Sequence, residues 1–407
     1  MKCRHCETPL QHGFLDLGFA PPSNAYLKAA DLARPEKYYP LRLLVCDACW
    51  LVQTEDYAQA DELFSADYAY FSSTSSGWLE HARRYAEQTI AALGLTPQSR
   101  VVEVASNDGY LLKNYVAAGI PCLGIEPTAS TAAAAEKLGI PVLREFFGEV
   151  LAQRLAAADQ QADLIAGNNV YAHVPDINDF TRGLKALLKP AGCITLEFPH
   201  LLQLIGQTQF DTVYHEHFSY LSLYTVERIF AAAGLRVWQV ETLSTHGGSL
   251  RIYGCHAEDG RAEHPSVAAV REQENDGGLR DLATYRAFQA RADRVKDGLL
   301  AFLIEAKREG KTVAAYGAAA KGNTLLNYAG VKPDLLPFVC DAAVAKQNKF
   351  MPGSHIPILA PVELARRRPD YLLILPWNIA AEVRFQNAAL ARQGTRFVTA
   401  VPELKVS

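Results

Sequence analysis

Between residues 100 and 200 the sequence alternates between short apolar runs and longer amphipathic stretches. The apolar runs are typical of buried strands, and the stretches between them have the spacing of helices. Strands that alternate with helices form a parallel sheet with helices on both faces. The expected strands are 100–104, 122–125, 141–143, 162–166 and 193–198, and the expected helices are 128–138, 149–157 and 177–188.

The pattern continues on both sides of this block. A helix is expected over 77–93, and a helix over 225–233 is followed by two strands, 235–241 and 250–256, that are most easily joined as an antiparallel hairpin. Residues 257–277 are polar and charged and are interpreted as a linker, after which one long helix ends near Gly310. Strands at 312–316, 337–339 and 371–375 indicate a second α/β unit.

Four of the eight cysteines form two Cys-x-x-Cys pairs near the N-terminus: Cys3 with Cys6, and Cys46 with Cys49. A Cys-x-x-Cys turn points both sulfurs at one ion, so two pairs supply the four thiolates of a closed, structural Zn²⁺ site. Disulfides are the alternative. They are disfavoured because the N-terminal residues contain no apolar signal-peptide core, so a cytoplasmic, reducing compartment is expected.

The charge balance narrows the classes of partner. The chain has 40 basic and 44 acidic residues, a formal net charge of −4. Such a chain does not attract polyanions, so neither a nucleic acid nor an anionic membrane is an expected partner. No apolar run approaches the ~18 residues that span a bilayer. A small-molecule substrate is expected, and the oligomeric state, monomer or homodimer, stays open.

A loop of small residues follows the first strand of the central block and consists of Ala105, Ser106, Asn107, Asp108 and Gly109. Small residues let the backbone approach a ligand, which in such folds lies at the carboxyl ends of the strands. Glu126 and Pro127 end the next strand, where a carboxylate can accept both hydroxyls of a ribose. The pattern predicts a nucleoside-type cofactor, S-adenosylmethionine or NAD, and an ordinary turn is the alternative. The antiparallel pair after the block favours a methyltransferase.

Two polar clusters have the residue types of an active site. Asn168, Asn169 and His173 follow the fourth strand, and Tyr214-His215-Glu216-His217 lies within an aromatic, apolar stretch. Titratable neighbours are costly to bury unless they are paired or used in function. A strand would send Tyr214 and Glu216 to one face and both histidines to the other, whereas a loop could bring more of them together. A satisfied buried network and a metal site remain as alternatives.

The second α/β unit has its own loop between strand and helix. Its candidate ligand-binding residues are Gly317, Ala318, Lys321, Gly322 and Asn323. Small residues, one lysine and the amides of a helix N-terminus suit a diphosphate. An empty turn is the alternative, and ATP hydrolysis is not indicated because Asn323 stands where a Walker A loop has its lysine.

Taken in order, the Cys-x-x-Cys pairs and the segments EVASNDGYLL, NNVYAHV, YHEHFSYLS and YGAAAKGNTLLN resemble the nucleotide-sugar C-methyltransferases. These enzymes use S-adenosylmethionine to methylate C-3 of TDP-4-keto-deoxysugars in antibiotic pathways, and the resemblance covers nearly the whole chain. It implies a zinc-binding module over 1–65, a class I methyltransferase domain over 66–260 and a Rossmann-like domain over 278–407, with the sugar nucleotide between the last two.

The resemblance also implies the roles of single residues. The catalytic cluster corresponds to His173, Tyr214, Glu216 and His217, together with a tyrosine that is Tyr68 or its competitor Tyr70. Histidine suits the removal of a proton next to a ketone, so His217 is assigned as the base, with Tyr214 and His173 as donors to the enolate oxygen. Glu216 would orient an imidazole or bind a sugar hydroxyl.

Three other functions stay open from the sequence. The enzyme could methylate another ketone carbon acid, and an NAD-dependent sugar-nucleotide oxidoreductase would also use an α/β loop with Glu126. A zinc-ribbon adaptor for nucleic acid would explain the cysteines, but it would leave YHEH unexplained.

Overall fold

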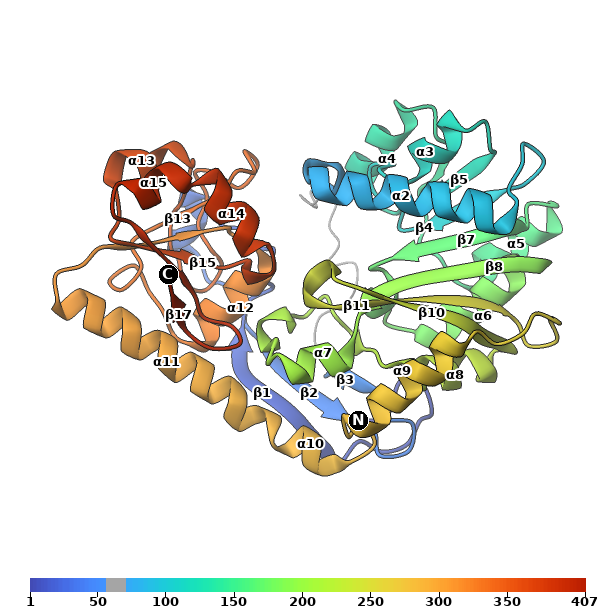
Figure 1. Ribbon diagram of the computed structural model, residues 1–407, viewed down its shortest axis with the longest axis horizontal. Coiled ribbons are helices and arrows are strands. Elements are labelled where there is room, and N and C mark those ends of the chain that lie inside the picture. The colour runs from blue at the N-terminus through green and yellow to red at the C-terminus, as the bar shows by residue number, and fades with distance from the viewer. Residues whose placement is uncertain (56–70) are drawn as a thin grey trace.

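Three β-sheets carry the fold of the computed structural model, which describes residues 1–55 and 71–407 (Figure 1). The central sheet has seven strands in the order β10-β11-β8-β7-β4-β5-β6. The five strands β4 to β8 run parallel, and β10 and β11 form the predicted antiparallel hairpin. Their bounds are β4 (Val101–Val104), β5 (Cys122–Ile125), β6 (Val142–Leu143), β7 (Ala162–Asn168), β8 (Leu188–Pro199), β10 (Leu235–Leu243) and β11 (Ser249–His256).

Helices cover both faces of the central sheet, and β4, β7 and most of β8 are accordingly buried on both sides. One face packs against α2 (Ser76–Leu93), α3 (Leu112–Ala117) and α4 (Ala129–Glu136). The other face packs against α5 (Glu149–Ala157), α6 (Ile177–Leu187) and α8 (Leu223–Ala232). The short α7 (Leu201–Gly206) follows β8. The α/β fold class predicted from the alternation is confirmed.

The C-terminal sheet has six strands in the order β14-β13-β12-β15-β16-β17, parallel except for β17. The strands are β12 (Val313–Tyr316), β13 (Val339–Cys340), β14 (Ile358–Leu359), β15 (Tyr371–Ile374), β16 (Arg396–Thr399) and β17 (Lys405–Val406). The helices after β12 are α12 (Ala320–Tyr328), α13 (Val362–Arg367), α14 (Ala380–Gln386) and α15 (Ala388–Arg392).

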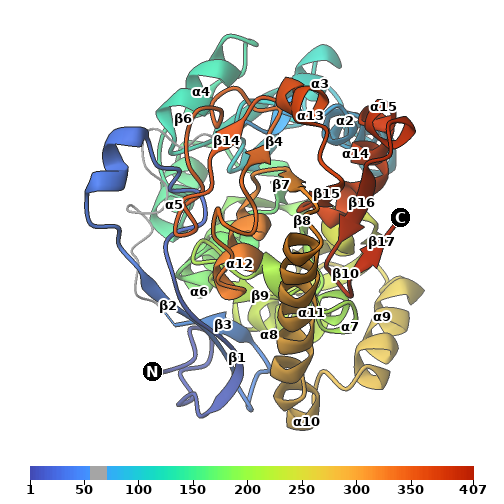
Figure 2. The ribbon, with the colours of Figure 1, turned by 90° about the vertical axis from the view of Figure 1, so that its left-hand side faces the viewer.

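The N-terminal sheet joins the other two parts of the molecule. It consists of β1 (His12–Ala20), β2 (Tyr39–Val45), β3 (Val52–Thr54) and β9 (Ser219–Tyr220), so its last strand comes from the central region of the chain. Strand β1 packs against the long helix α11 (Phe288–Arg308) near the start of that helix (Figure 2). There the rings of Phe14 and Phe288 stack with centroids 4.7 Å apart. The N-terminal module therefore shares a hydrophobic core with the C-terminal domain.

Two sequence expectations between the domains are wrong. The linker over 257–277 contains a helix, α9 (Pro265–Asp276), which begins with proline at its first turn and buries Val267 and Val270. The single long helix is two helices, α10 (Leu282–Arg286) and α11, separated at Ala287. Among the described residues, no helix has the length and hydropathy to cross a membrane.

Candidate active site

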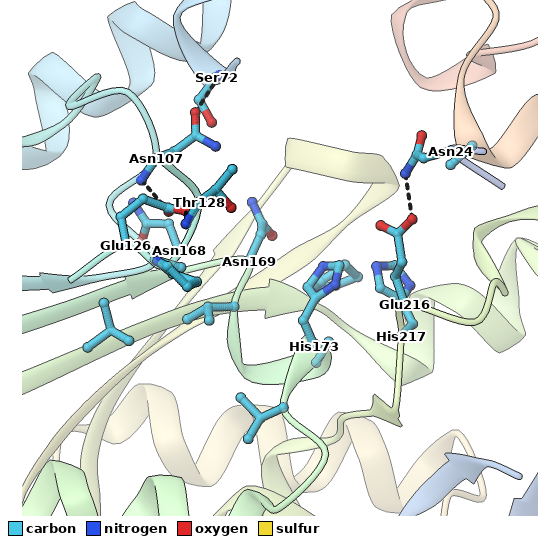
Figure 3. Close-up of a pocket in the computed structure, with 18 of the residues that line it drawn as sticks. Asn24, Ser72, Asn107, Glu126, Thr128, Asn168, Asn169, His173, Glu216 and His217 are labelled. Carbon is cyan, nitrogen blue, oxygen red and sulfur yellow. Dashed lines mark hydrogen bonds between the residues drawn. The ribbon is translucent and has the colours of Figure 1, made fainter. Parts of the chain in front are cut away.

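A cavity of about 810 Å³ lies between the central and C-terminal sheets. Its wall combines the loop after β4, the end of β5, the segment after β7, the turn before β9 and the start of α12. Figure 3 shows Asn107, Glu126 and Asn168 on one side of this space and His173, Glu216 and His217 on the other, with Asn169 between them. The sequence clusters of the central block thus face a single cavity.

The loop after β4 is shaped by the carboxylate of Glu126. This side chain is 5% exposed and accepts hydrogen bonds from the backbone N–H groups of Asn107 (3.0 Å) and Thr128 (2.8 Å). Ala105 and Asn107 have φ values of +57° and +49°, which bend the loop tightly. Ala105, Asn107, Glu126 and Pro127 line the cavity.

The other three loop residues contact the rest of the domain and not the cavity. Gly109 has a φ of +78°, and a Cβ there would collide with Ile140. The Asp108 carboxylate accepts a hydrogen bond from the backbone N–H of Ser73 (3.1 Å). Ser106 is fully buried beneath Gly124. None of these three residues lines the cavity.

Asn168 and Asn169 line the cavity at the carboxyl end of β7. The Asn168 amide donates to the Tyr110 hydroxyl (3.4 Å), and its buried Oδ1 has no hydrogen bond to any residue in 1–55 or 71–407. Asn169 Nδ2 lies 3.1 Å from Nε2 of His246, in the β10–β11 connection. Burial lowers the pKa of His246 to about 4, and nearby Lys321 acts in the same direction.

The YHEH segment forms a turn and not a strand, closed by a hydrogen bond from His217 N to Tyr214 O (2.9 Å). The turn places Tyr214, Glu216 and His217 on the cavity. The ring centroids of Tyr214 and His217 lie 4.0 Å apart, and those of His173 and His217 lie 4.6 Å apart. His215 points elsewhere, with Nε2 3.2 Å from the carbonyl of Pro40. Of the two possibilities that the sequence left open for this segment, strand or loop, the structure has the loop.

The protonation state of His217 follows from its surroundings. Its Nδ1 lies 2.9 Å from the carbonyl of Thr212, which only accepts, so Nδ1 carries the hydrogen and Nε2 carries the lone pair of the neutral ring. Burial lowers the pKa of His217 well below its usual value, and the neighbouring imidazole of His173 disfavours protonation of His217 further. Burial lowers the pKa of His173 to about 4, so both rings are neutral at pH 7.

The C-terminal domain contributes the start of α12. Ala319, Ala320 and Lys321 line the cavity, and the N-cap residue of the helix, Ala319, has no side chain that could cap it. Lys321 Nζ donates to Asn378 Oδ1 (2.8 Å) and lies 4.9 Å from the centre of the Trp377 ring.

The remaining loop residues predicted for the substrate lie beside the cavity. Gly317, with a φ of +91°, packs against Pro376, and Gly322 packs against Leu375. The backbone N–H of Ala318 donates to Asp341 (2.7 Å), and the Asn323 side chain donates to the carbonyl of Ser23 (2.6 Å).

The four cysteine sulfurs of Cys3, Cys6, Cys46 and Cys49 lie within 4.8 Å of one another. The separations Cys3–Cys49 and Cys6–Cys46 are both 3.5 Å, close to the roughly 3.8 Å between thiolates around tetrahedral zinc. The donor set fits Zn²⁺. Bound there, the ion would hold the two ends of the module together.

Several residues of the wall were missed from the sequence. His246 stands beside two glycines in the β10–β11 connection, a signal that could have been noticed. Asn24, Trp78, Phe146 and Lys346 reach the cavity through tertiary packing, which no local pattern indicates. Tyr68 and Tyr70 lie outside the described residues.

Comparisons with known proteins agree with this arrangement. Three family models match the chain: "Putative zinc binding domain" over residues 3–64, "Methyltransferase domain" over 78–240 and "C-methyltransferase C-terminal domain" over 244–402. The chain is 34% identical to C-methyltransferase NovU of Streptomyces niveus over 405 residues, which cover 100% of this chain and 96% of that protein.

Solved structures of methyltransferases align with part of the chain. Magnesium protoporphyrin IX methyltransferase of Synechocystis PCC 6803 with bound SAH aligns with a TM-score of 0.35 and 14% identity over 44% of this chain and 83% of its own. A possible histamine N-methyltransferase of Thermotoga maritima aligns with a TM-score of 0.35 and 19% identity over 46% of this chain and 96% of its own.

The match to NovU runs through the whole chain, so it spans all three parts of the fold. The comparisons thus favour a methyltransferase over the two other functional classes that the sequence left open, an oxidoreductase and a nucleic-acid adaptor. The chain belongs to the C-methyltransferase family and is an S-adenosylmethionine-dependent C-methyltransferase with an N-terminal zinc-binding domain.

Proposed function

We propose that the enzyme transfers the methyl group of S-adenosylmethionine to C-3 of a nucleotide-linked 4-keto-deoxysugar, with TDP as the nucleotide. One observation carries the proposal: a single cavity contains the Glu126 loop, the Tyr214–His217 turn and the N-terminus of α12. Cofactor, reacting carbon and diphosphate each find suitable chemistry along its wall. The similarity to NovU, a C-methyltransferase, supports the same reaction type.

The cofactor end is the loop after β4. Each oxygen of Glu126 accepts one backbone N–H and keeps further lone pairs for the ribose hydroxyls of S-adenosylmethionine. Asn168 and Asn169 supply amide groups at the carboxyl end of β7, where the reacting end of the cofactor belongs.

The diphosphate end is the start of α12. Its uncapped backbone N–H groups and the ammonium of Lys321 favour an anion. Lys346 supplies a second positive charge on the same wall.

The residues between these ends suit enolate chemistry. His217 Nε2 takes the proton from C-3, and the electron pair of the broken C–H bond moves onto the 4-keto oxygen. Tyr214 and His173 donate hydrogen bonds to that oxygen, whose charge develops only during the reaction. The enolate carbon then bonds to the methyl group, and the breaking S–C bond leaves its electrons on sulfur as S-adenosylhomocysteine. Neutral His217 is ready to accept the proton.

The test is a methylation assay with trideuteromethyl S-adenosylmethionine and a TDP-4-keto-deoxysugar. We expect one trideuteromethyl group in place of the C-3 hydrogen, located by NMR, and weaker turnover of the UDP sugar. Transfer to oxygen or to another carbon would contradict the C-3 assignment. Turnover of a free ketone, with TDP sugars left untouched, would favour the alternative carbon acid.

A further inference from the structure

The zinc-binding module sends one segment, residues 22–27, to the wall of the cavity. We call this segment the strap. It leaves the end of β1 and turns through hydrogen bonds from Ala25 N to Pro22 O (3.0 Å) and from Tyr26 N to Asn24 O (2.9 Å). Leu27 then pairs with Phe350 of the C-terminal domain through two backbone hydrogen bonds of 3.0 and 2.8 Å. The strap therefore has a defined backbone path.

The strap is also fixed on the side of α12. The Asn323 side chain donates to the carbonyl of Ser23 (2.6 Å). The hydroxyl of Tyr26 donates to the carbonyl of Ala318 (2.5 Å), in the loop before the helix. These contacts anchor the strap on both sides of Asn24 and so fix the position of its backbone.

Within residues 1–55, the described part of the zinc-binding module, Asn24 lines the cavity. Its Nδ2 donates a hydrogen bond of 2.8 Å to Oε1 of Glu216 (Figure 3). A carboxylate only accepts hydrogen bonds, so the amide nitrogen must face it. Glu216 is 2% exposed, which leaves little water to replace this donor.

We propose that Asn24 is a positioning residue for the methyl transfer: it fixes the Glu216 carboxylate, so the zinc-binding module completes the active site. A buried carboxylate loses its preferred orientation when a donor is removed and is left partly unsatisfied. With Oε1 held, the orientation of Oε2 in the cavity is set as well. This inference rests on the proposed function through the role of Glu216.

The experiment is a double-mutant cycle on the full chain with S-adenosylmethionine and the TDP-4-keto-deoxysugar. Asn24→Ala is expected to lower kcat about ten- to hundredfold, with KM for S-adenosylmethionine unchanged. Because Asn24 acts through Glu216, the double variant with Glu216→Ala should be no slower than Glu216→Ala alone. Additive losses, or a kcat of Asn24→Ala within about twofold of the wild type, would overturn the proposal.

Two further variants separate positioning from folding. Asn178→Ala is the matched control, because the Asn178 amide donates to the carbonyls of Arg4 and His5 and so ties the zinc-binding module to α6. Asp179 and Phe180 of α6 line the cavity, but Asn178 itself is not a lining residue. The control variant should keep the wild-type kcat. A loss in Asn178→Ala equal to that in Asn24→Ala would mean general loosening of the module and would overturn the proposal.

Asn24→Asp keeps the size of the side chain, so it still tests the proposal if the alanine variant does not fold. It places a second carboxylate beside Glu216, so one of the two must bind a proton. Within the described residues, titratable groups close to Glu216 include Tyr26, whose pKa burial raises, and His173 and His217, whose pKa values burial lowers. We expect activity that is lost at high pH and partly restored as the pH falls. An unchanged pH profile would overturn the proposal, whereas an inactive wild type would contradict the proposed function instead.

Discussion

At the scale of the residue, His217 offers the sharpest test of the proposed chemistry. Its Nδ1 is committed to the carbonyl of Thr212, so only Nε2 can take a proton. General base catalysis contributes about 10²- to 10⁴-fold, and His217→Asn should lower kcat by that factor while the affinity for S-adenosylhomocysteine stays unchanged. Kinetics and calorimetry on the same protein measure both.

His215 provides the matched control for this variant. It lies two residues away, but its Nε2 contacts the carbonyl of Pro40 and its side chain does not line the cavity. His215→Asn should therefore keep most of the activity. Large losses from Tyr214→Phe and His173→Asn together with a small one from His217→Asn would contradict the assignment of His217 as the base.

The pH dependence of the reaction follows from the same burial. Burial lowers the pKa of His217 well below its usual value, so the base loses its lone pair only at low pH. The acid limb of kcat/KM should lie below pH 6.5, the pKa of an unperturbed imidazole. A limb at or above that pH would indicate a base other than this buried ring.

The residues of the site were predictable to different degrees. His173, Tyr214, Glu216 and His217 stand out because titratable groups are rare in apolar segments, and they do line one cavity. The separation of His215 from its neighbours depends on the turn, which the sequence left open. Asn24 lies almost two hundred positions from Glu216, and only tertiary structure brings the two together.

At the scale of the element, two short 3-10 helices join the domains beside the cavity. Asp211, in η4 (Phe210–Thr212), is fully buried and accepts a hydrogen bond from Trp377 Nε1 (2.7 Å), in η6 (Trp377–Ile379). Burial raises the pKa of Asp211 to about 6, although Lys321 acts in the opposite direction. Burial therefore makes the ionised form of Asp211 unfavourable in the folded protein.

The sign of this effect gives a prediction for Asp211→Asn. Between about pH 4 and pH 6 the folded wild type binds more protons than the unfolded chain, so its stability falls as the pH rises through this window. Asparagine has no such penalty. From pH 4 to pH 7 the free energy of unfolding should shift in favour of the variant, by roughly 3 kcal/mol at most. Denaturant unfolding at several pH values measures it.

Asp297→Asn is the control for this measurement, because that side chain is 70% exposed. It should show little pH-dependent difference from the wild type. A difference between Asp211→Asn and the wild type that does not change with pH would mean that the carboxylate is not desolvated as the structure indicates.

The elements themselves were mostly readable from the sequence. Strands such as β4 and β7 are runs of buried apolar residues, and their order follows from alternation with helices. Helix α9 was missed because the polarity of its segment suggested a linker, although Pro265 at its first turn and the buried pair Val267 and Val270 are helix signals. The break at Ala287 has no comparable signal in the sequence.

At the scale of the whole molecule, the zinc-binding module packs against both the methyltransferase domain and the C-terminal domain. Cys3, Cys46 and Cys49 belong to the core that includes α8 of the methyltransferase domain, and Phe14 belongs to the core of the C-terminal domain. The module also supplies strand pairing to β9, directly after the Tyr214–His217 turn. Its folding is thus coupled to the position of the active-site turn.

Removal of zinc should therefore reduce activity through structure and not through chemistry. Four thiolates form a closed site, and structural zinc contributes on the order of 10 kcal/mol to the folding of such modules. Metal analysis should give one zinc ion per chain, and Cys46→Ser or chelation should lower both Tm and kcat. The affinity for S-adenosylhomocysteine should fall much less, because the Glu126 loop is held by its own backbone hydrogen bonds. A zinc-free protein with normal kcat would show that the module does not support the active site.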